Sequence, residues 1–317
     1  MRIQNVVAGA LAAGLLAASP LPALAWSNQG HMVTGAIAYD DLARSDPALV
    51  ATIERIMASH PDKARFDKAL AGLTGEARTR RLFELMARWP DDARGGPYDH
   101  PAWHYWLRVV PSTGDPIKVP PALLATTTGE APEAYRLSLA TVRDGFAPAA
   151  DRAVALCWLF HLAGDIQQPL HAGHLISGRF PMSDRAGESD LVREPSGTVI
   201  NLHEYWDNAV GDDSDDLAHV DATRGRLERD WPRASLPELN GKAGAEAFIA
   251  WADESYALAR TVAYGNGTFE GASKAADAPV VSPAYAKARF DLGGRRVALG
   301  GYRIADGVRA GLGGGPR

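Results

Sequence analysis

The chain has 317 residues, of which 46% are hydrophobic and 22% are charged, so it can bury a sizeable core and is not intrinsically disordered. Its formal net charge is −5, from 33 basic and 38 acidic residues, which argues against a protein that coats nucleic acid with lysine and arginine. The single cysteine, Cys157, excludes an intramolecular disulfide.

Residues 1–25 have the features of a secretory signal peptide. Arg2 precedes a run of small apolar residues over 6–18, and the segment ends in Ala-Leu-Ala, a cleavage pattern of the A-x-A type. The apolar run is too short to span a bilayer comfortably. We therefore expect a domain over 26–317 that begins at Trp26, is secreted or periplasmic, and has no membrane anchor in its mature form.

Helical patterns dominate the rest of the chain. The segment 151–163 is apolar nearly all round, which is typical of a helix in the middle of a domain. The aromatic and β-branched residues over 103–110 predict a short strand or extended run. The segment 173–200 is rich in Gly, Ser, Asp and Pro without periodicity, which predicts a long loop. Because strand signals are few, one mostly α-helical domain is predicted. The predicted helices cover 31–43 (with Asn28 as N-cap), a segment opening at Asp46-Pro47, 76–88, 132–146, 151–163, 202–209, 245–263 and 283–310, the last broken near Gly293-Gly294.

Two histidine–aspartate pairs stand at four-residue spacing. His161 and Asp165 close the apolar segment, and His203 and Asp207 have the same spacing. This spacing places both side chains of a pair on one helix face, one turn apart. In apolar surroundings such side chains are costly unless they have partners. Imidazole and carboxylate ligands together suit zinc.

A lone pair of this kind is more often an ordinary hydrogen bond on a helix surface. Two pairs, together with His171 and a buried setting, favour a metal site instead. Other histidine and aspartate residues are further candidate ligands. His31 stands five residues after Trp26, Asp91 lies in Trp-Pro-Asp, and His104 lies in Trp-His-Tyr.

These motifs resemble those of the zinc-dependent nucleases typified by the fungal S1 and P1 nucleases. That family begins its mature chain with Trp, followed by Gly-His, Trp-x-Asp, a His-aromatic pair, His-x-x-x-Asp-x-x-Gln-Pro-Leu-His and Asn-Leu-His-x-x-Trp-Asp. Every element is present here in that order. The resemblance implies a mostly α-helical phospholipase C/P1 nuclease-like fold with a trinuclear zinc cleft. The lack of a disulfide, together with the signal peptide, favours a bacterial member.

The resemblance also implies roles for individual residues. Asp165 would bridge two zinc ions, and Asp91, Arg94 and Asp165 would be the catalytic residues. Arg94 has two interpretations, stabilisation of charge in the transition state or a surface salt bridge to a neighbouring aspartate. Three Zn²⁺ are implied, the first bound by Asp91, His104, His161 and Asp165, the second by His171, His203 and Asp207, and the third by His31, Asp165 and the α-amino nitrogen and carbonyl oxygen of Trp26.

The implied reaction is hydrolysis of phosphodiester bonds in single-stranded DNA and RNA to 5′-phosphate products by a monomeric enzyme, with 3′-nucleotidase activity as a further expectation. One alternative is a zinc-dependent phospholipase C, although such enzymes typically end the last metal motif with Glu where this chain has Asp207. Another is a non-enzymatic zinc-binding protein. Glu188 stands where the family often has an amide, which leaves base preference open. The remaining histidines match no ligand position; His174 is expected near the substrate, and His60, His100 and His219 at the surface.

Overall fold

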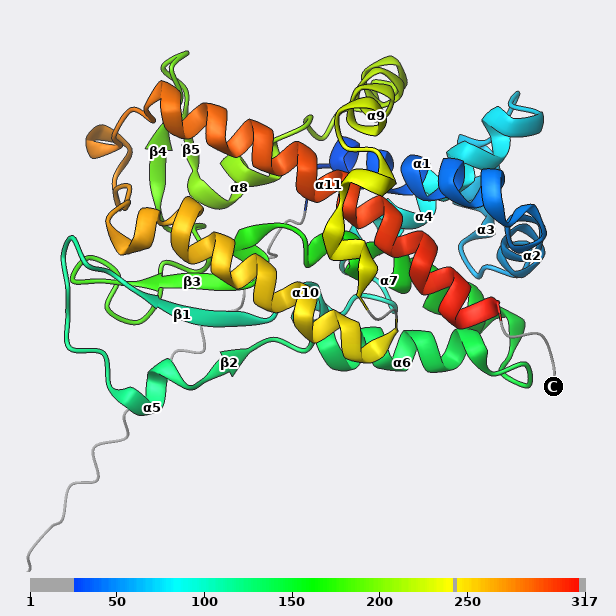
Figure 1. The fold of residues 1–317 in the computed structure, drawn as a ribbon, viewed down its shortest axis with the longest axis horizontal. Coiled ribbons are helices and arrows are strands. Elements are labelled where there is room, and N and C mark those ends of the chain that lie inside the picture. Colours follow the sequence, from blue (N-terminus) through cyan, green and yellow to red (C-terminus); the bar gives the residue numbers. More distant parts are fainter. Residues whose placement is uncertain (1–25, 242–243, 314–317) are drawn as a thin grey trace, which may run out of the picture.

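The structure is a computed structural model that describes residues 26–241 and 244–313, so the predicted signal peptide lies outside the described residues. Helices dominate the described residues (Figure 1), which confirms the predicted mostly α-helical fold. None of these helices is both long and apolar enough to cross a membrane. The helices are α1 (Asn28–Ser45), α2 (Pro47–Met57), α3 (Lys63–Ala69), α4 (Gly75–Asp92), α5 (Pro121–Leu124), α6 (Ala131–Arg143), α7 (Ala149–Asp165), α8 (Leu202–Asp207), α9 (Leu217–Asp230), α10 (Ala245–Leu258) and α11 (Pro283–Leu312).

Short strands form two small sheets in the described part of the chain. In the first sheet β1 pairs antiparallel with β2 and parallel with β3, and in the second β4 and β5 form a hairpin. The prediction of a structureless loop over 173–200 is therefore wrong in part. One of its strands, β3, pairs with β1 far away in sequence, and a local pattern does not carry that information, whereas β4 and β5 pair with each other. The strands are β1 (Leu107–Pro111), β2 (Thr127–Thr128), β3 (Gly173–Ile176), β4 (Leu191–Arg193) and β5 (Val199–Asn201).

Polar caps set where the helices near the histidines begin. The hydroxyl of Ser27 accepts from the backbone N–H of Gly30 at 3.3 Å, so Ser27 is the N-cap of α1 in place of the predicted Asn28. The side chain of Asn201 accepts from the backbone N–H of Glu204 at 2.8 Å and caps α8. These caps fix the first turns that carry the ligand candidates of α1 and α8.

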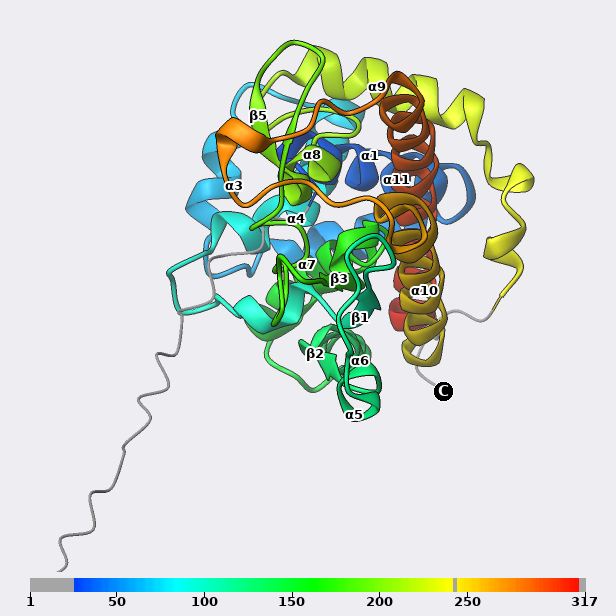
Figure 2. The ribbon, with the colours of Figure 1, turned by 90° about the vertical axis from the view of Figure 1, so that its left-hand side faces the viewer.

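Helix α11 is continuous over 283–312, so the predicted break near Gly293-Gly294 is wrong. The glycines serve close helix packing instead. A Cβ atom at Gly301 would lie 2.6 Å from Cβ of Ile37 on α1, and one at Gly293 would collide with Ala209. Small residues thus let α11 lie directly against the site-bearing helices, along one side of the molecule (Figure 2).

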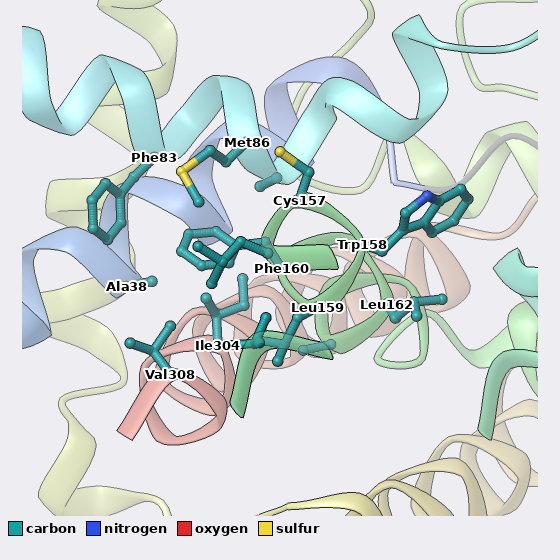
Figure 3. Close-up of a cluster of buried hydrophobic side chains, with 14 of the residues drawn as sticks. Ala38, Phe83, Met86, Cys157, Trp158, Leu159, Phe160, Leu162, Ile304 and Val308 are labelled. Atoms are coloured by element: carbon teal, nitrogen blue, oxygen red, sulfur yellow. The ribbon is translucent and has the colours of Figure 1, made fainter. Parts of the chain in front are cut away.

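Helix α7 is the centre of the fold, as its apolar sequence predicts. It contacts α1, α4, α6 and α11, and its side chains from Ala155 to Asp165 are all buried. Figure 3 shows the core around it, where Phe83 and Met86 of α4 and Ile304 and Val308 of α11 surround Phe160. This packing fixes the position of the last turn of α7, which carries His161 and Asp165.

Candidate metal centre

The eight histidine and aspartate side chains predicted as metal ligands come together in the structure. In the described residues they fall into three groups, and within each group the ligand atoms lie within 4.8 Å of one another. The groups are His31 with Asp91 and His161, His104 with His161 and Asp165, and His171 with His203 and Asp207.

Helix ends bring these residues together. His31 lies in the first turn of α1, Asp91 in the last turn of α4, and the pair His161 and Asp165 in the last turn of α7. His104 closes the short 3-10 turn over 101–104. The second pair lies on α8, and His171 closes the 3-10 turn over 169–171. Residues from six segments thus meet beside the end of one buried helix.

Asp165 contacts three imidazoles with its two carboxylate oxygens. Its Oδ1 lies 3.2 Å from Nε2 of His31, and its Oδ2 lies 3.1 Å from Nδ1 of His104. Oδ2 also lies 3.0 Å from Nε2 of His161. Asp91 stands slightly further away, with its Oδ2 3.5 Å from Nε2 of His31. A carboxylate in this central place can ligate two cations at once.

The ring geometry of two histidines provides a test of whether a metal fits. Nδ1 of His171 donates to the carbonyl oxygen of His104 at 2.6 Å, and Nδ1 of His203 donates to that of Ala186 at 2.8 Å. A neutral imidazole that donates through Nδ1 carries a lone pair on Nε2, which can ligate a metal. The Nε2 atoms of His171 and His203 lie 3.2 Å apart. Two nitrogens on one tetrahedral zinc ion lie about 3.3 Å apart, given a Zn–N distance of about 2.0–2.1 Å.

Other buried polar atoms at the site point to the same conclusion. Within the described residues, Nε2 of His31, Oδ1 of Asp165 and Oδ2 of Asp207 make no hydrogen bond although they are buried. Such atoms are costly in a protein interior unless a partner compensates them. A set of imidazole nitrogens and carboxylate oxygens at these distances fits zinc. The residues present therefore suit the metal that the motifs predict.

The electrostatics of the site shift His31, His104 and Asp91 toward the form that binds a metal, whereas the pKa values of His161 and Asp207 are raised. Burial lowers the pKa of His31 and of His104, which keeps both imidazoles neutral. Burial alone would raise the pKa of Asp91, but His161 and Arg94 hold it at about 2. Asp207 differs, because burial raises its pKa well above the ordinary value. A bound cation would reverse that shift.

Trp26 is anchored beside these groups. Its side chain is buried, and its indole Nε1 donates to the carbonyl oxygen of Gly164 at 2.9 Å, next to Asp165. The backbone N–H of the following residue, Ser27, donates to the carbonyl oxygen of Asp207 at 3.2 Å. Residues on both sides of the metal centre thus hold the segment where the mature chain is expected to begin.

Arg94 contacts the site through Asp91. Its Nε and Nη2 donate to Oδ1 of Asp91 at 2.9 and 2.5 Å, and its side chain is 18% exposed. Arg94 forms the predicted salt bridge to Asp91. Its guanidinium therefore lies next to the group that contains His31, Asp91 and His161. Arg94 thus holds Asp91 from a position beside the candidate metal centre.

The sequence did not reveal the groups that orient the ligands. These groups are mostly backbone carbonyls, such as Ala87 O, which accepts from Nδ1 of His161 at 2.8 Å. One is a side chain: Gln168 Nε2 donates to Oδ1 of Asp207 at 2.8 Å. Gln168 lies inside the motif Gln-Pro-Leu-His, which was the only signal for it. Hydrogen bonds of this kind fix the ring orientation of ligating histidines.

The histidines outside the metal centre follow the predictions in part. His219 is exposed, as expected, and His100 is partly buried and stacked on Trp103. His60 is buried, so its predicted surface position is wrong. Its ring packs edge-on against Phe66 and Trp89, and burial lowers its pKa to about 4. An isolated histidine carries no local signal of such packing.

Comparison with known proteins gives a family match. A model of the family described as S1/P1 nuclease matches residues 26–311. Among curated proteins, Endonuclease 4 of Arabidopsis thaliana is 31% identical over 162 residues, and Endonuclease 5 of the same plant is 29% identical over 162 residues. Each match covers 48% of this chain and 48% of the relative, so the matched part spans about half the length of these curated relatives.

Proposed function

Because this chain belongs to the S1/P1 nuclease family, we propose that it is a zinc-dependent endonuclease that hydrolyses phosphodiester bonds of single-stranded DNA and RNA and leaves 5′-phosphate products. The observation that carries this proposal is the gathering of the eight predicted histidine and aspartate ligands into three compact groups. A side activity as 3′-nucleotidase belongs to the same proposal.

The proposed ligand sets use the contacts described above. Asp91, His104, His161 and Asp165 would hold one zinc ion, His171, His203 and Asp207 a second, and His31, Asp165 and the α-amino nitrogen and carbonyl oxygen of Trp26 a third. Zinc bound there lowers the pKa of a coordinated water and neutralises phosphate charge.

The chain's own residues would complete the site. Asp165 would hold two cations at a fixed separation, because its oxygens face different imidazoles. Arg94 would donate N–H groups to the phosphate while its contact with Asp91 limits its movement. Donors preorganised in this way stabilise charge that develops in the transition state.

The acidic composition of the chain is compatible with an anionic substrate. Three Zn²⁺ would outweigh the carboxylates of Asp91, Asp165 and Asp207, and so make the cleft positive inside a protein of net charge −5. A cleft of this kind captures a few phosphates locally, whereas a protein that coats a duplex needs many exposed basic residues. A single strand suits it because an unstacked base can enter a cleft.

Export and oligomeric state are part of the proposal. Residues 1–25 would direct secretion or transfer to the periplasm, and their removal would expose the α-amino group of Trp26. The mature protein would act as a monomer, because its metal centre is assembled from one chain.

The test is a comparison of substrates with purified mature protein loaded with zinc. Single-stranded DNA, duplex DNA, RNA and phosphatidylcholine vesicles are supplied separately, with chelator-treated protein as the control. We expect 5′-mononucleotides and short 5′-phosphorylated fragments from the single strands, and slower release from duplex DNA. Release of diacylglycerol alone would replace the proposal with a phospholipase C. Three bound zinc ions without turnover of any substrate would favour a zinc-binding protein.

A further inference from the structure

A pocket of about 410 Å³ opens beside Arg94, where the start of α3 meets the end of α4 and the turn that follows it. This volume lies within the range of about 300–1,000 Å³ that is common for small-molecule sites. Its walls include Asp62, Arg65, Trp89, Asp92, Arg94 and Tyr98.

The pocket adjoins the metal centre through a single residue. Asp91 precedes one wall residue, Asp92, and accepts hydrogen bonds from another, Arg94. Asp91 itself lies 3.5 Å from Nε2 of His31. A phosphate held by the metal centre and Arg94 would therefore place the next part of its molecule at the mouth of this pocket.

Two aromatic rings form the apolar side of the pocket. The indole of Trp89 is held in place by its Nε1, which donates to Oδ2 of Asp62 at 3.1 Å. The ring centroids of Trp89 and Tyr98 lie 5.6 Å apart at an angle of 51°. Trp89 is buried whereas Tyr98 is partly exposed, so Tyr98 is the more accessible of the two aromatic side chains. Flat aromatic groups stack on such faces, and every nucleobase has one.

On the charged side of the pocket, arginines pair with the aspartates. Nε of Arg65 donates to Asp62 at 2.9 Å, and its Nη1 lies 4.0 Å from Asp92. Asp92 also accepts from Arg88 at 3.0 Å. The pocket thus presents both hydrogen-bond donors and acceptors, and its carboxylates are neutralised by arginines. The edge of a nucleobase needs both kinds of partner.

We propose that this pocket holds the base of one nucleotide adjacent to the phosphate that is cleaved, with its ring against Tyr98. The inference rests on the proposed nuclease function and adds to it a binding site on the Arg94 side of the metal centre. Arg94 then contacts both the phosphate and the entrance of the base pocket.

The test compares Tyr98→Ala with wild type on short single strands in which methylphosphonate linkages leave one cleavable phosphodiester. One strand is intact, and two others each lack the base on one side of that linkage. For the intact strand we expect Tyr98→Ala to lower kcat/KM by about 5- to 100-fold, the range for loss of one base–aromatic stack. For one of the two base-lacking strands this loss should shrink to less than about 2-fold, because wild type has then lost the same stack.

Matched variants separate binding from folding. Tyr98→Phe keeps the ring and should retain the wild-type preference, and Phe146→Ala removes a fully exposed aromatic ring outside the pocket and should change nothing. Bound zinc and the unfolding midpoint are measured for each variant. If Tyr98→Ala does not fold, Arg65→Ala, at a half-exposed position on the rim, is tested on the same three strands for the same base-dependent loss.

The outcomes distinguish the base pocket from the nuclease function. If wild type cleaves DNA but the loss from the pocket variant is equal on all three strands, or absent on the intact one, the base pocket is refuted while the nuclease function stands. If wild type cleaves no strand at all, the proposed function itself fails.

Discussion

Nδ1 of His203 donates a hydrogen bond of 2.8 Å to the carbonyl oxygen of Ala186, a residue held at a φ of 57°. The neighbours Arg185 and Gly187 also have positive φ, at 59° and 91°. Three successive left-handed residues are costly for side chains other than glycine. This turn aims Nε2 of His203 at the ligand group that contains Asp207.

Gly187→Ala should therefore weaken metal binding by the group of His171, His203 and Asp207. A Cβ at this position would lie 2.9 Å from the backbone N of His203, so the turn must shift. We expect about 10- to 100-fold lower affinity for that zinc ion, the range for loss of an orienting contact. Zinc titration measures it. Gly197→Ala is the matched control, because its φ is also positive, at 97°, but nothing lies within 4 Å of its Cβ.

Asp165→Asn should remove the bridge between two proposed zinc ions. The amide keeps the size of the side chain but not its charge, so the imidazoles of His31, His104 and His161 lose their shared anion. Bound zinc should fall below two ions per chain, with more than about 100-fold loss of activity, and chelator should lower the unfolding midpoint less than in wild type. Asp67→Asn on α3 is an exposed control. Three zinc ions in the Asp165 variant would contradict the assignment.

Extra residues before Trp26 should abolish the third zinc site. A peptide nitrogen cannot replace a free amine as a ligand, and the buried indole leaves the segment little freedom to move. A mature protein extended by Gly-Ser at this end should bind two zinc ions and lose more than about tenfold of its activity. The same two residues added after Arg317 serve as control. Full zinc content and activity in the N-terminally extended protein would show that the amine does not take part.

Arg94→Ala should lower kcat by about 10²- to 10³-fold, the usual loss when a transition-state donor is removed. Bound zinc should persist, because Asp91 keeps its contacts with three imidazoles. Arg94→Lys should recover part of the rate. Arg136→Ala, an exposed pair member on α6, is the control. If zinc and activity fall together, Arg94 only positions Asp91.

Asp190 should make the stability of the fold depend on pH. This buried carboxyl makes no hydrogen bond within the described residues, and burial and then the nearby Asp184 raise its pKa to about 8. Between about pH 4 and pH 8 the folded state then holds a proton that the unfolded state has lost. The free energy of unfolding should therefore fall as pH rises through that window, by on the order of 1 kcal/mol per pH unit.

Asp190→Asn should flatten this decline, because the neutral amide resembles the protonated acid. Denaturant unfolding at pH 5 and pH 8 measures the difference. Asp184 remains as a second buried acid with a pKa raised to about 7, so part of the decline persists in the variant. Asp230→Asn, at an exposed position, should follow wild type. A variant whose decline equals that of wild type would mean that Asp190 is ionised in the fold throughout.

The sequence by itself determined which residues form the candidate metal centre. The spacing of His161 with Asp165 and of His203 with Asp207 places each pair on one helix face, because helix geometry is local. The all-round apolar pattern before His161 likewise predicted that α7 is buried. The residues of the candidate metal centre and the mostly α-helical fold were predicted from such short-range information.

Only the tertiary structure decided how these ligands are held. Which carbonyl orients His203, where Tyr98 stands relative to Trp89, and why α11 passes Gly293 without a break all depend on residues that are distant in sequence. Backbone carbonyls occur at every position and glycine serves turns and close packing alike, so neither leaves a pattern in the sequence. The role of each carbonyl or glycine depends on which residue the tertiary packing places beside it.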